Sequence, residues 1–129
     1  MHVAVISIAL LGLLVFGLGL RVSLMRGSTQ TVIGHGADPT DPLHKMVRAH
    51  ANATEYAPML AVLMLIVGSR DPAAWMVWTM AAATVFRYLH AAGMITCVTL
   101  AKPHPLRFAG ALGTYVCGLA LVVATLLVA

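Results

Sequence analysis

Charged residues are scarce in this sequence, and acidic residues are the scarcest. Only 9% of the 129 residues are Asp, Glu, Lys or Arg, and only four residues are acidic. In contrast, 60% of the residues are hydrophobic and the mean hydropathy is +0.92. A soluble domain of this length needs far more polar surface than this composition provides. The composition therefore excludes a soluble protein and predicts a single-domain integral membrane protein.

Aromatic residues, cysteines and basic runs are scarce as well. Aromatic side chains make up 6% of the chain, and the eight Lys and Arg residues are scattered at the ends of apolar segments. A net charge of +4 without a basic run does not indicate nucleic-acid binding, so we expect no nucleic-acid partner. Cys97 and Cys117 lie in separate apolar runs, where they have no metal-ligand spacing and a packing role is expected.

Four apolar segments are long enough to cross a bilayer as helices. The first follows Met1-His2, which provides no basic segment, and no A-x-A cleavage site comes after it, so a signal peptide is not indicated. Gly12, Gly17 and Gly19 in this segment would let a neighbouring helix approach closely. Asp41-Pro42 is expected to cap the second helix. The predicted fold is an all-α integral membrane bundle forming one domain, 1–129, with transmembrane helices at about 3–24, 43–67, 73–99 and 108–128.

The distribution of Lys and Arg predicts the orientation of these helices. Basic residues flank the first and third loops, whereas only Arg70 flanks the second. The positive-inside rule then places the first and third loops in the cytoplasm and both termini outside.

The start of the second helix has a stripe of polar side chains. At about 100° per residue, Arg48, Asn52, Glu55 and Met59 lie on one face, with Tyr56 at its edge. A charged side chain near the bilayer centre costs at least about 2.5–3.5 kcal/mol, so such residues usually face a bundle interior and have a function. In the alternative interpretation, the stripe only holds helices together.

Further polar residues are expected at a similar depth in the membrane. Arg87 and His90 lie in the second half of the third helix, while Arg107 and Arg26 lie at the cytoplasmic ends of the fourth and first. At about 1.5 Å per residue, Glu55 and His90 are each roughly 13 Å from the cytoplasmic ends of their helices. Several arginines with one carboxylate predict a cationic cavity. Such a cavity suits an anion that also has an amine, such as a small peptide.

The stretch from Arg48 to Pro58 reads Arg-Ala-His-Ala-Asn-Ala-Thr-Glu-Tyr-Ala-Pro. At the start of the second of four membrane helices, it resembles the hallmark of the MAPEG family, the membrane-associated proteins in eicosanoid and glutathione metabolism. This family includes microsomal glutathione transferases, leukotriene C4 synthase and microsomal prostaglandin E synthase. Arg87-x-x-His90 is similar to its small bacterial branch, and the resemblance spans nearly the whole chain.

The resemblance implies a homotrimer in a bacterial inner membrane, with glutathione bound between adjacent subunits near the cytoplasmic face. It implies a transferase or peroxidase-like protein in which Arg107 stabilises the glutathione thiolate and a lipophilic substrate arrives from the lipid. Catalytically competent eukaryotic members have a tyrosine at the position of Met94. The expected glutathione-binding residues are Arg48, Asn52, Glu55, Tyr56, Arg87 and His90, with Arg26 at the mouth of the site.

Two other functions remain open from the sequence. A non-catalytic accessory or assembly subunit would use the polar residues for subunit contacts, and the departure at Met94 favours it. A b-type haem protein would use His50 and His90 as ligands. His50, however, lies about 160° around the helix from Asn52 and cannot share its pocket. We therefore expect glutathione as co-substrate, with no metal or haem.

Overall fold

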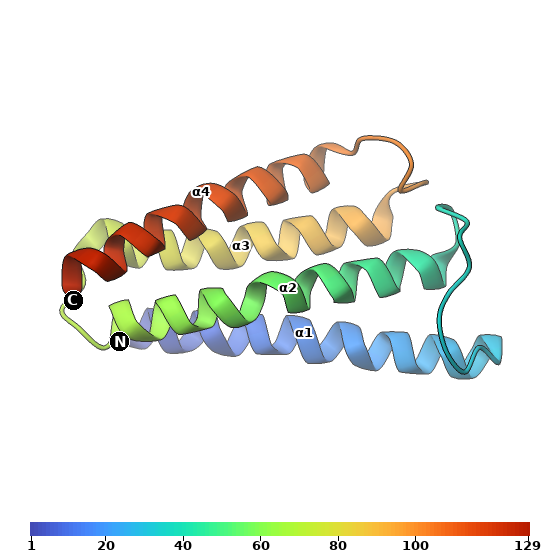
Figure 1. Ribbon diagram of the computed structural model, residues 1–129, viewed down its shortest axis with the longest axis horizontal. Coiled ribbons are helices and arrows are strands. Elements are labelled where there is room, and N and C mark those ends of the chain that lie inside the picture. The colour runs from blue at the N-terminus through green and yellow to red at the C-terminus, as the bar shows by residue number, and fades with distance from the viewer.

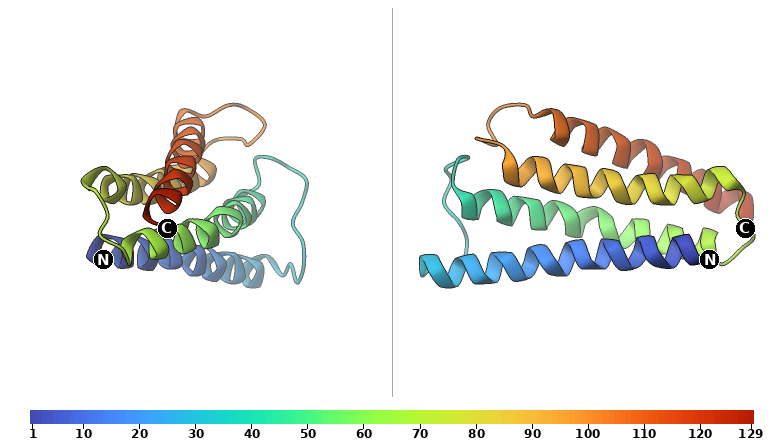
Figure 2. Two further views of the ribbon diagram at one scale, coloured as in Figure 1. Left: turned by 60° about the vertical axis from the view of Figure 1, so that its left-hand side comes forward. Right: turned by 180° about the vertical axis from the view of Figure 1, so that it is seen from behind.

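Four antiparallel helices form an up-down-up-down bundle (Figure 1). The computed structural model describes residues 1–129, in which α1 spans His2–Thr29, α2 Pro42–Gly68, α3 Ala74–Thr96 and α4 Pro105–Val128. Both termini lie at one end of the bundle, and the two longer loops, 30–41 and 97–104, lie at the other (Figures 1 and 2). The predicted all-α bundle of four helices is confirmed.

The four helices pack as two pairs, α1 with α2 and α3 with α4. α2 also contacts α3 and α4, and α1 contacts α3, but α1 and α4 do not touch each other. The cross-section is therefore a rhombus with α2 and α3 on its short diagonal. As a result, α2, α3 and α4 are all in mutual contact.

Several helix ends differ from the sequence prediction. α1 continues to Thr29 rather than residue 24, because Ser28 and Thr29 donate their hydroxyls back to the Met25 carbonyl, each at 2.9 Å. α4 begins at Pro105 rather than residue 108, since proline suits the first turn of a helix. α3 spans Ala74–Thr96 rather than 73–99. The predicted cap of α2 is confirmed, because the carboxylate of Asp41 accepts the backbone N–H of His44 at 2.7 Å.

The two long loops are bound to each other. The backbone N–H of Leu100 donates to the Pro39 carbonyl at 2.9 Å, and Lys45 Nζ donates to the Cys97 carbonyl at 3.1 Å. Within the first loop, Thr40 donates its N–H and its hydroxyl to Asp38, and these two bonds lower the pKa of that carboxyl. The loops therefore join the two helix pairs at one end of the bundle.

Much of the molecular surface is apolar. Only 30 of the 129 residues are buried, and large side chains such as Phe16, 80% exposed, and Leu126, 74% exposed, point outward. α1, α2 and α4 are long and apolar enough to cross a membrane. Apolar surface on this scale requires lipid or another subunit as a neighbour. The chain is an integral membrane protein.

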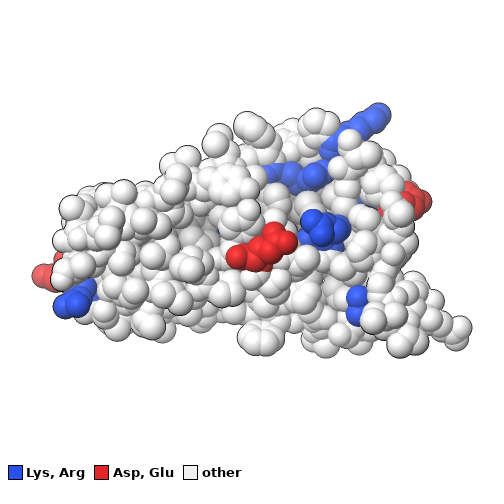
Figure 3. Space-filling view, viewed as in Figure 1, with Lys and Arg blue, Asp and Glu red and all other residues white.

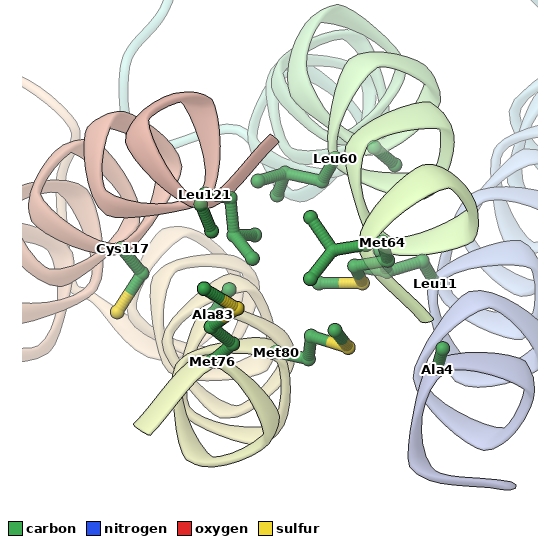
Figure 4. Close-up of a cluster of buried hydrophobic side chains, with 12 residues drawn as sticks. Ala4, Leu11, Leu60, Met64, Met76, Met80, Ala83, Cys117 and Leu121 are labelled. Carbon is green, nitrogen blue, oxygen red and sulfur yellow. The ribbon is translucent and has the colours of Figure 1, made fainter. Parts of the chain in front are cut away.

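The apolar core is divided into two clusters. The larger lies near the termini and contains twelve buried residues from all four helices, among them Leu11, Met64, Met80 and Leu121 (Figure 4). The smaller contains eight residues of α1, α2 and α3, including Met94, and none of α4. In the half of the bundle near the loops, the inner face of α4 is therefore free to meet polar side chains.

Glycines bring α3 and α4 close together in this half. A Cβ added at Gly110 would lie 2.5 Å from the backbone N of His90, and one added at Gly93 would lie 2.7 Å from the backbone N of Arg107. The glycines singled out from the sequence behave differently. Gly12 and Gly17 have no atom within 4 Å of a built Cβ, and only Gly19 has a close neighbour, the ring of His50.

We predict that Gly110→Ala destabilises the protein because its methyl group forces α4 away from the backbone of α3. Overpacking of this kind costs about 1–3 kcal/mol. Thermal unfolding in mild detergent, followed by circular dichroism, should show a lower Tm. Gly27→Ala is the control, since a Cβ there meets no atom within 4 Å. Equal Tm values for the two variants would show that α3 and α4 are not closely packed at this point.

Candidate functional site

Arg87 is the only charged side chain in the buried interior, with 1% of its surface exposed. Its Nη2 donates to Asn52 Oδ1 at 2.7 Å and to the Asn52 carbonyl at 3.1 Å, while its Nε has no hydrogen-bond partner. Both acceptors are neutral. A buried cation without an opposite charge is costly, so this arrangement favours the binding of an anion.

Two tyrosines extend the polar cluster from α2 to α4. The hydroxyls of Tyr56 and Tyr115 are 2.9 Å apart, and their rings meet edge to face with centroids 5.8 Å apart. The Arg87 Cζ atom lies 5.0 Å from the centroid of the Tyr56 ring, which is a cation–π distance. The guanidinium and the two phenols therefore form one connected group on three helices.

A small polar cavity of about 30 Å³ lies at the centre of this group. Beside it, an apolar groove of about 330 Å³ runs between α2 and α4. Tyr56, Thr114 and Tyr115 line both spaces and separate one from the other. The cavity is lined by Asn52, Tyr56, Arg87, His90, Ala111, Thr114 and Tyr115.

His90 and Arg107 connect α3 to the first turn of α4. His90 Nδ1 donates to the Arg107 carbonyl at 3.0 Å. The Arg107 guanidinium does not enter the cavity, because its Nη1 donates to the carbonyls of Leu100 at 3.1 Å and Lys102 at 3.2 Å. Arg107 nevertheless precedes Ala111 by one turn, so it lies on the face of α4 that lines the cavity.

Arg48 and Glu55 are exposed on α2. The Glu55 carboxylate accepts a hydrogen bond from Asn52 Nδ2 at 3.5 Å and lines the polar end of the groove. Figure 3 shows an acidic and a basic patch side by side near the middle of this face. These charges point out of the subunit and are available to a molecule bound on its surface.

Arg26 lies apart from the cavity. Its Nη2 donates to the Gly34 carbonyl at 3.4 Å, and α1 contributes no residue to the cavity lining. His50 also faces α1, where it packs against Gly19, whereas His90 faces α4. No group of three or more His, Cys, Asp or Glu side chains is arranged to hold a metal ion.

The structure therefore brings four of the predicted residues into one cavity, namely Asn52, Tyr56, Arg87 and His90. Glu55 lies at the edge of the adjoining groove, whereas the side chains of Arg26, Arg48 and Arg107 lie outside the cavity. Tyr115 was not predicted. Its only signal in the sequence is that it follows Arg107 by about two helical turns.

Comparison with known proteins identifies a family. The model of the MAPEG family matches residues 4–127, which include nearly all of the four helices. No curated protein matches the chain.

We predict that Asn52→Ala destabilises the protein, because Arg87 keeps its buried charge and loses the Oδ1 acceptor. Hydrogen bonds to charged groups contribute about 1.5–3 kcal/mol, which sets the size of the expected loss. Chemical or thermal unfolding in detergent measures it. Thr54→Ala, on the same helix, removes a hydroxyl that bonds only to the Ala51 carbonyl, and serves as the control. An Asn52→Ala protein as stable as the control would contradict the role of this contact.

Proposed function

Because the chain belongs to the MAPEG family, a membrane family of glutathione and eicosanoid metabolism, we propose that it is a glutathione-dependent transferase. It activates the thiol of glutathione for attack on lipophilic electrophiles. The observation that carries the proposal is the buried Arg87, which has only neutral acceptors and a free Nε in a cavity between three helices. Glutathione provides the missing negative charge, since it has two carboxylates.

The surrounding residues suit the other groups of glutathione. Arg48 is exposed and binds a carboxylate, while Glu55 is exposed and binds the amine. Asn52, Tyr56 and His90 offer polar atoms from the cavity wall. Because Arg48 and Glu55 face outward, a second subunit completes the site, and the assembly is a homotrimer, as is typical of this family.

Arg107 is the proposed thiolate-stabilising residue. A guanidinium beside the sulfur favours the thiolate over the thiol, and lowering the thiol pKa by about two units corresponds to roughly 2.7 kcal/mol. In the structure this guanidinium binds two neutral carbonyls. A thiolate is a stronger acceptor than either carbonyl because it is charged. Glutathione binding therefore draws the Arg107 side chain from the 97–104 loop to the sulfur.

The proposed site lies in the cytoplasmic half of a bacterial inner membrane. The end of the bundle with the two long loops carries Lys45, Lys102 and Arg107, and the opposite end carries Arg70 next to Asp71. The positive-inside rule assigns the first end to the cytoplasm. In this orientation all four helices cross the membrane, and α3 carries its polar residues inside the bundle.

A non-catalytic accessory subunit is the second candidate function. The observation that favours it is that Arg107 holds the 97–104 loop in place while Met94 packs in the apolar cluster of α1, α2 and α3. A subunit of this kind would bind glutathione weakly or not at all and would show no turnover.

We predict that Glu55→Gln weakens glutathione binding by roughly tenfold or more, because the amine loses a charged acceptor. Isothermal titration with glutathione and with S-methylglutathione measures the affinity, and native mass spectrometry measures assembly. The trimer should remain intact. Asp71→Asn makes the same change of charge at the opposite end of the bundle and should leave the affinity unchanged. Loss of the trimer with unchanged affinity would support the accessory-subunit function instead.

We also predict that Arg107→Ala abolishes the thiolate absorbance of bound glutathione, together with turnover of a reactive aryl halide. Ultraviolet difference spectroscopy near neutral pH measures the thiolate. The affinity for S-methylglutathione, which cannot ionise at sulfur, should change little. Arg70→Ala removes a guanidinium at the other end of the bundle and is the control. A full thiolate signal in Arg107→Ala would transfer this role to Arg87 or Arg26.

A further inference from the structure

Tyr115 is a polar side chain that the proposed glutathione site does not use. It comes from α4, it is 53% exposed, and it stands with Tyr56 and Thr114 at the boundary between the polar cavity and the apolar groove. The hydroxyl of Thr114 is already satisfied by the Gly110 carbonyl at 2.7 Å. At this boundary, therefore, only the two phenols have hydroxyls that are not committed to their own helix.

The two phenols have two hydroxyl hydrogens, and only one of them is needed for the hydrogen bond that joins the phenols. A single proton lies in the 2.9 Å contact between their oxygens, so the other hydroxyl hydrogen can be donated elsewhere. Either phenol oxygen can be the donor in this contact. Tyr115 is 53% exposed while Tyr56 is half-buried, so the free hydrogen is accessible to a molecule in the groove when Tyr56 donates to Tyr115. In that arrangement the hydrogen bonds form a chain and strengthen one another, and the free hydrogen belongs to Tyr115.

We propose that Tyr115 is a catalytic residue of this site and that it donates its free hydrogen to an oxygen of the electrophilic substrate. The substrate is an α,β-unsaturated carbonyl compound with an alkyl chain, and the chain lies in the groove between α2 and α4. This inference rests on the proposed glutathione transferase function and specifies its substrate class.

The groove fits an alkyl chain attached to a polar head. Its volume of about 330 Å³ lies at the lower end of the range for small-molecule sites. Apolar side chains line its length, and its polar residues are confined to the end next to the cavity. Substrate dissolved in the bilayer enters it from the side of α4, where apolar side chains are exposed, because Glu55 at the polar end of the groove faces the neighbouring subunit of the proposed trimer. The apolar lining consists of Met59, Leu60, Leu63, Leu119 and Val122, with Gly118 between them.

The reaction places negative charge on the oxygen next to Tyr115. The thiolate sulfur forms a bond to the β-carbon, the electron pair of the C=C double bond shifts toward the carbonyl carbon, and the carbonyl electron pair moves onto oxygen. The hydrogen bond from Tyr115 stabilises this enolate. The α-carbon then takes a proton from solvent, equal to the one that glutathione released on ionising, and the carbonyl reforms. The net reaction adds S–H across the double bond and needs no oxidant or reductant.

Tyr115→Phe tests the hydroxyl. The rates of glutathione addition to trans-2-nonenal and to benzyl bromide are measured on the same preparations, since the second reaction releases bromide and develops no charge on oxygen. We expect the ratio of the two kcat values to fall by roughly tenfold or more. Tyr88→Phe removes a hydroxyl that bonds the Leu10 carbonyl at 2.8 Å, away from the groove, and should leave the ratio unchanged.

The two proposals fail in different ways. If the native protein turns over benzyl bromide but Tyr115→Phe leaves the ratio unchanged, the role of Tyr115 is wrong and the transferase function stands. If the native protein binds no glutathione and turns over neither compound, the transferase function is wrong, and this inference falls with it.

Gly118→Leu tests the groove. A Cβ at Gly118 would lie 3.8 Å from Leu60 Cδ2, so Gly118→Ala fits by ordinary contact, whereas leucine extends into the groove. In the native protein and in Gly118→Ala, KM should fall as the 2-alkenal lengthens from six to nine carbons. In Gly118→Leu this dependence should disappear. If Gly118→Leu instead disrupts the trimer and leaves the chain-length dependence intact, the groove is a subunit contact.

Discussion

The charge of Arg87 is the constraint on which the interior of this protein depends. A guanidinium inside a membrane bundle is removed from bulk water, so its neighbours must supply most of its favourable contacts. Asn52 supplies two oxygens and Tyr56 supplies the face of its ring, and both lie on α2. These contacts fix the rotation of α2 relative to α3. They still leave Nε without a partner, and this missing contact is what supports the proposed binding role of the cavity.

Backbone geometry on α4 makes room for the polar cavity. Gly110 lets α4 approach the backbone of His90, and Thr114 returns its hydroxyl to its own helix. α4 therefore comes close enough to close the cavity, and the hydroxyl of Thr114 does not compete as a donor within it. The apolar clusters on either side contain few polar atoms, so polarity is confined to one level of the bundle. The candidate site therefore combines a closely packed wall, formed by α3 and α4, with one buried charge that has no ionic partner.

Helical periodicity in the sequence predicted much of this site, because Asn52, Tyr56 and Arg87 come from regular helices whose faces follow from spacing alone. The cap at Asp41 was equally predictable, since it depends on neighbouring residues. Spacing does not determine where a long side chain ends, so the attachment of Arg107 to the 97–104 loop was not foreseen. Tyr115 was missed because its partner lies 59 residues away on another helix. Most of the close helix contacts at glycine lie between α3 and α4, although the sequence pattern had pointed to the glycines of α1 as the sites of close approach.

The connectivity of the bundle sets the order in which the site is assembled during synthesis. Chains emerge from the ribosome N-terminus first, so the α1–α2 hairpin enters the membrane before α3 exists. Asn52 and Tyr56 are therefore already in place when Arg87 follows, and the guanidinium meets its acceptors as it arrives rather than crossing the lipid alone. The bond between Leu100 and Pro39 ties the loop after α3 to the loop before α2, and the contacts of α4 form last. Arg87, whose burial costs the most free energy, is inserted next to residues that are already in place to contact it. The order of the helices in the sequence therefore helps to bury its charge.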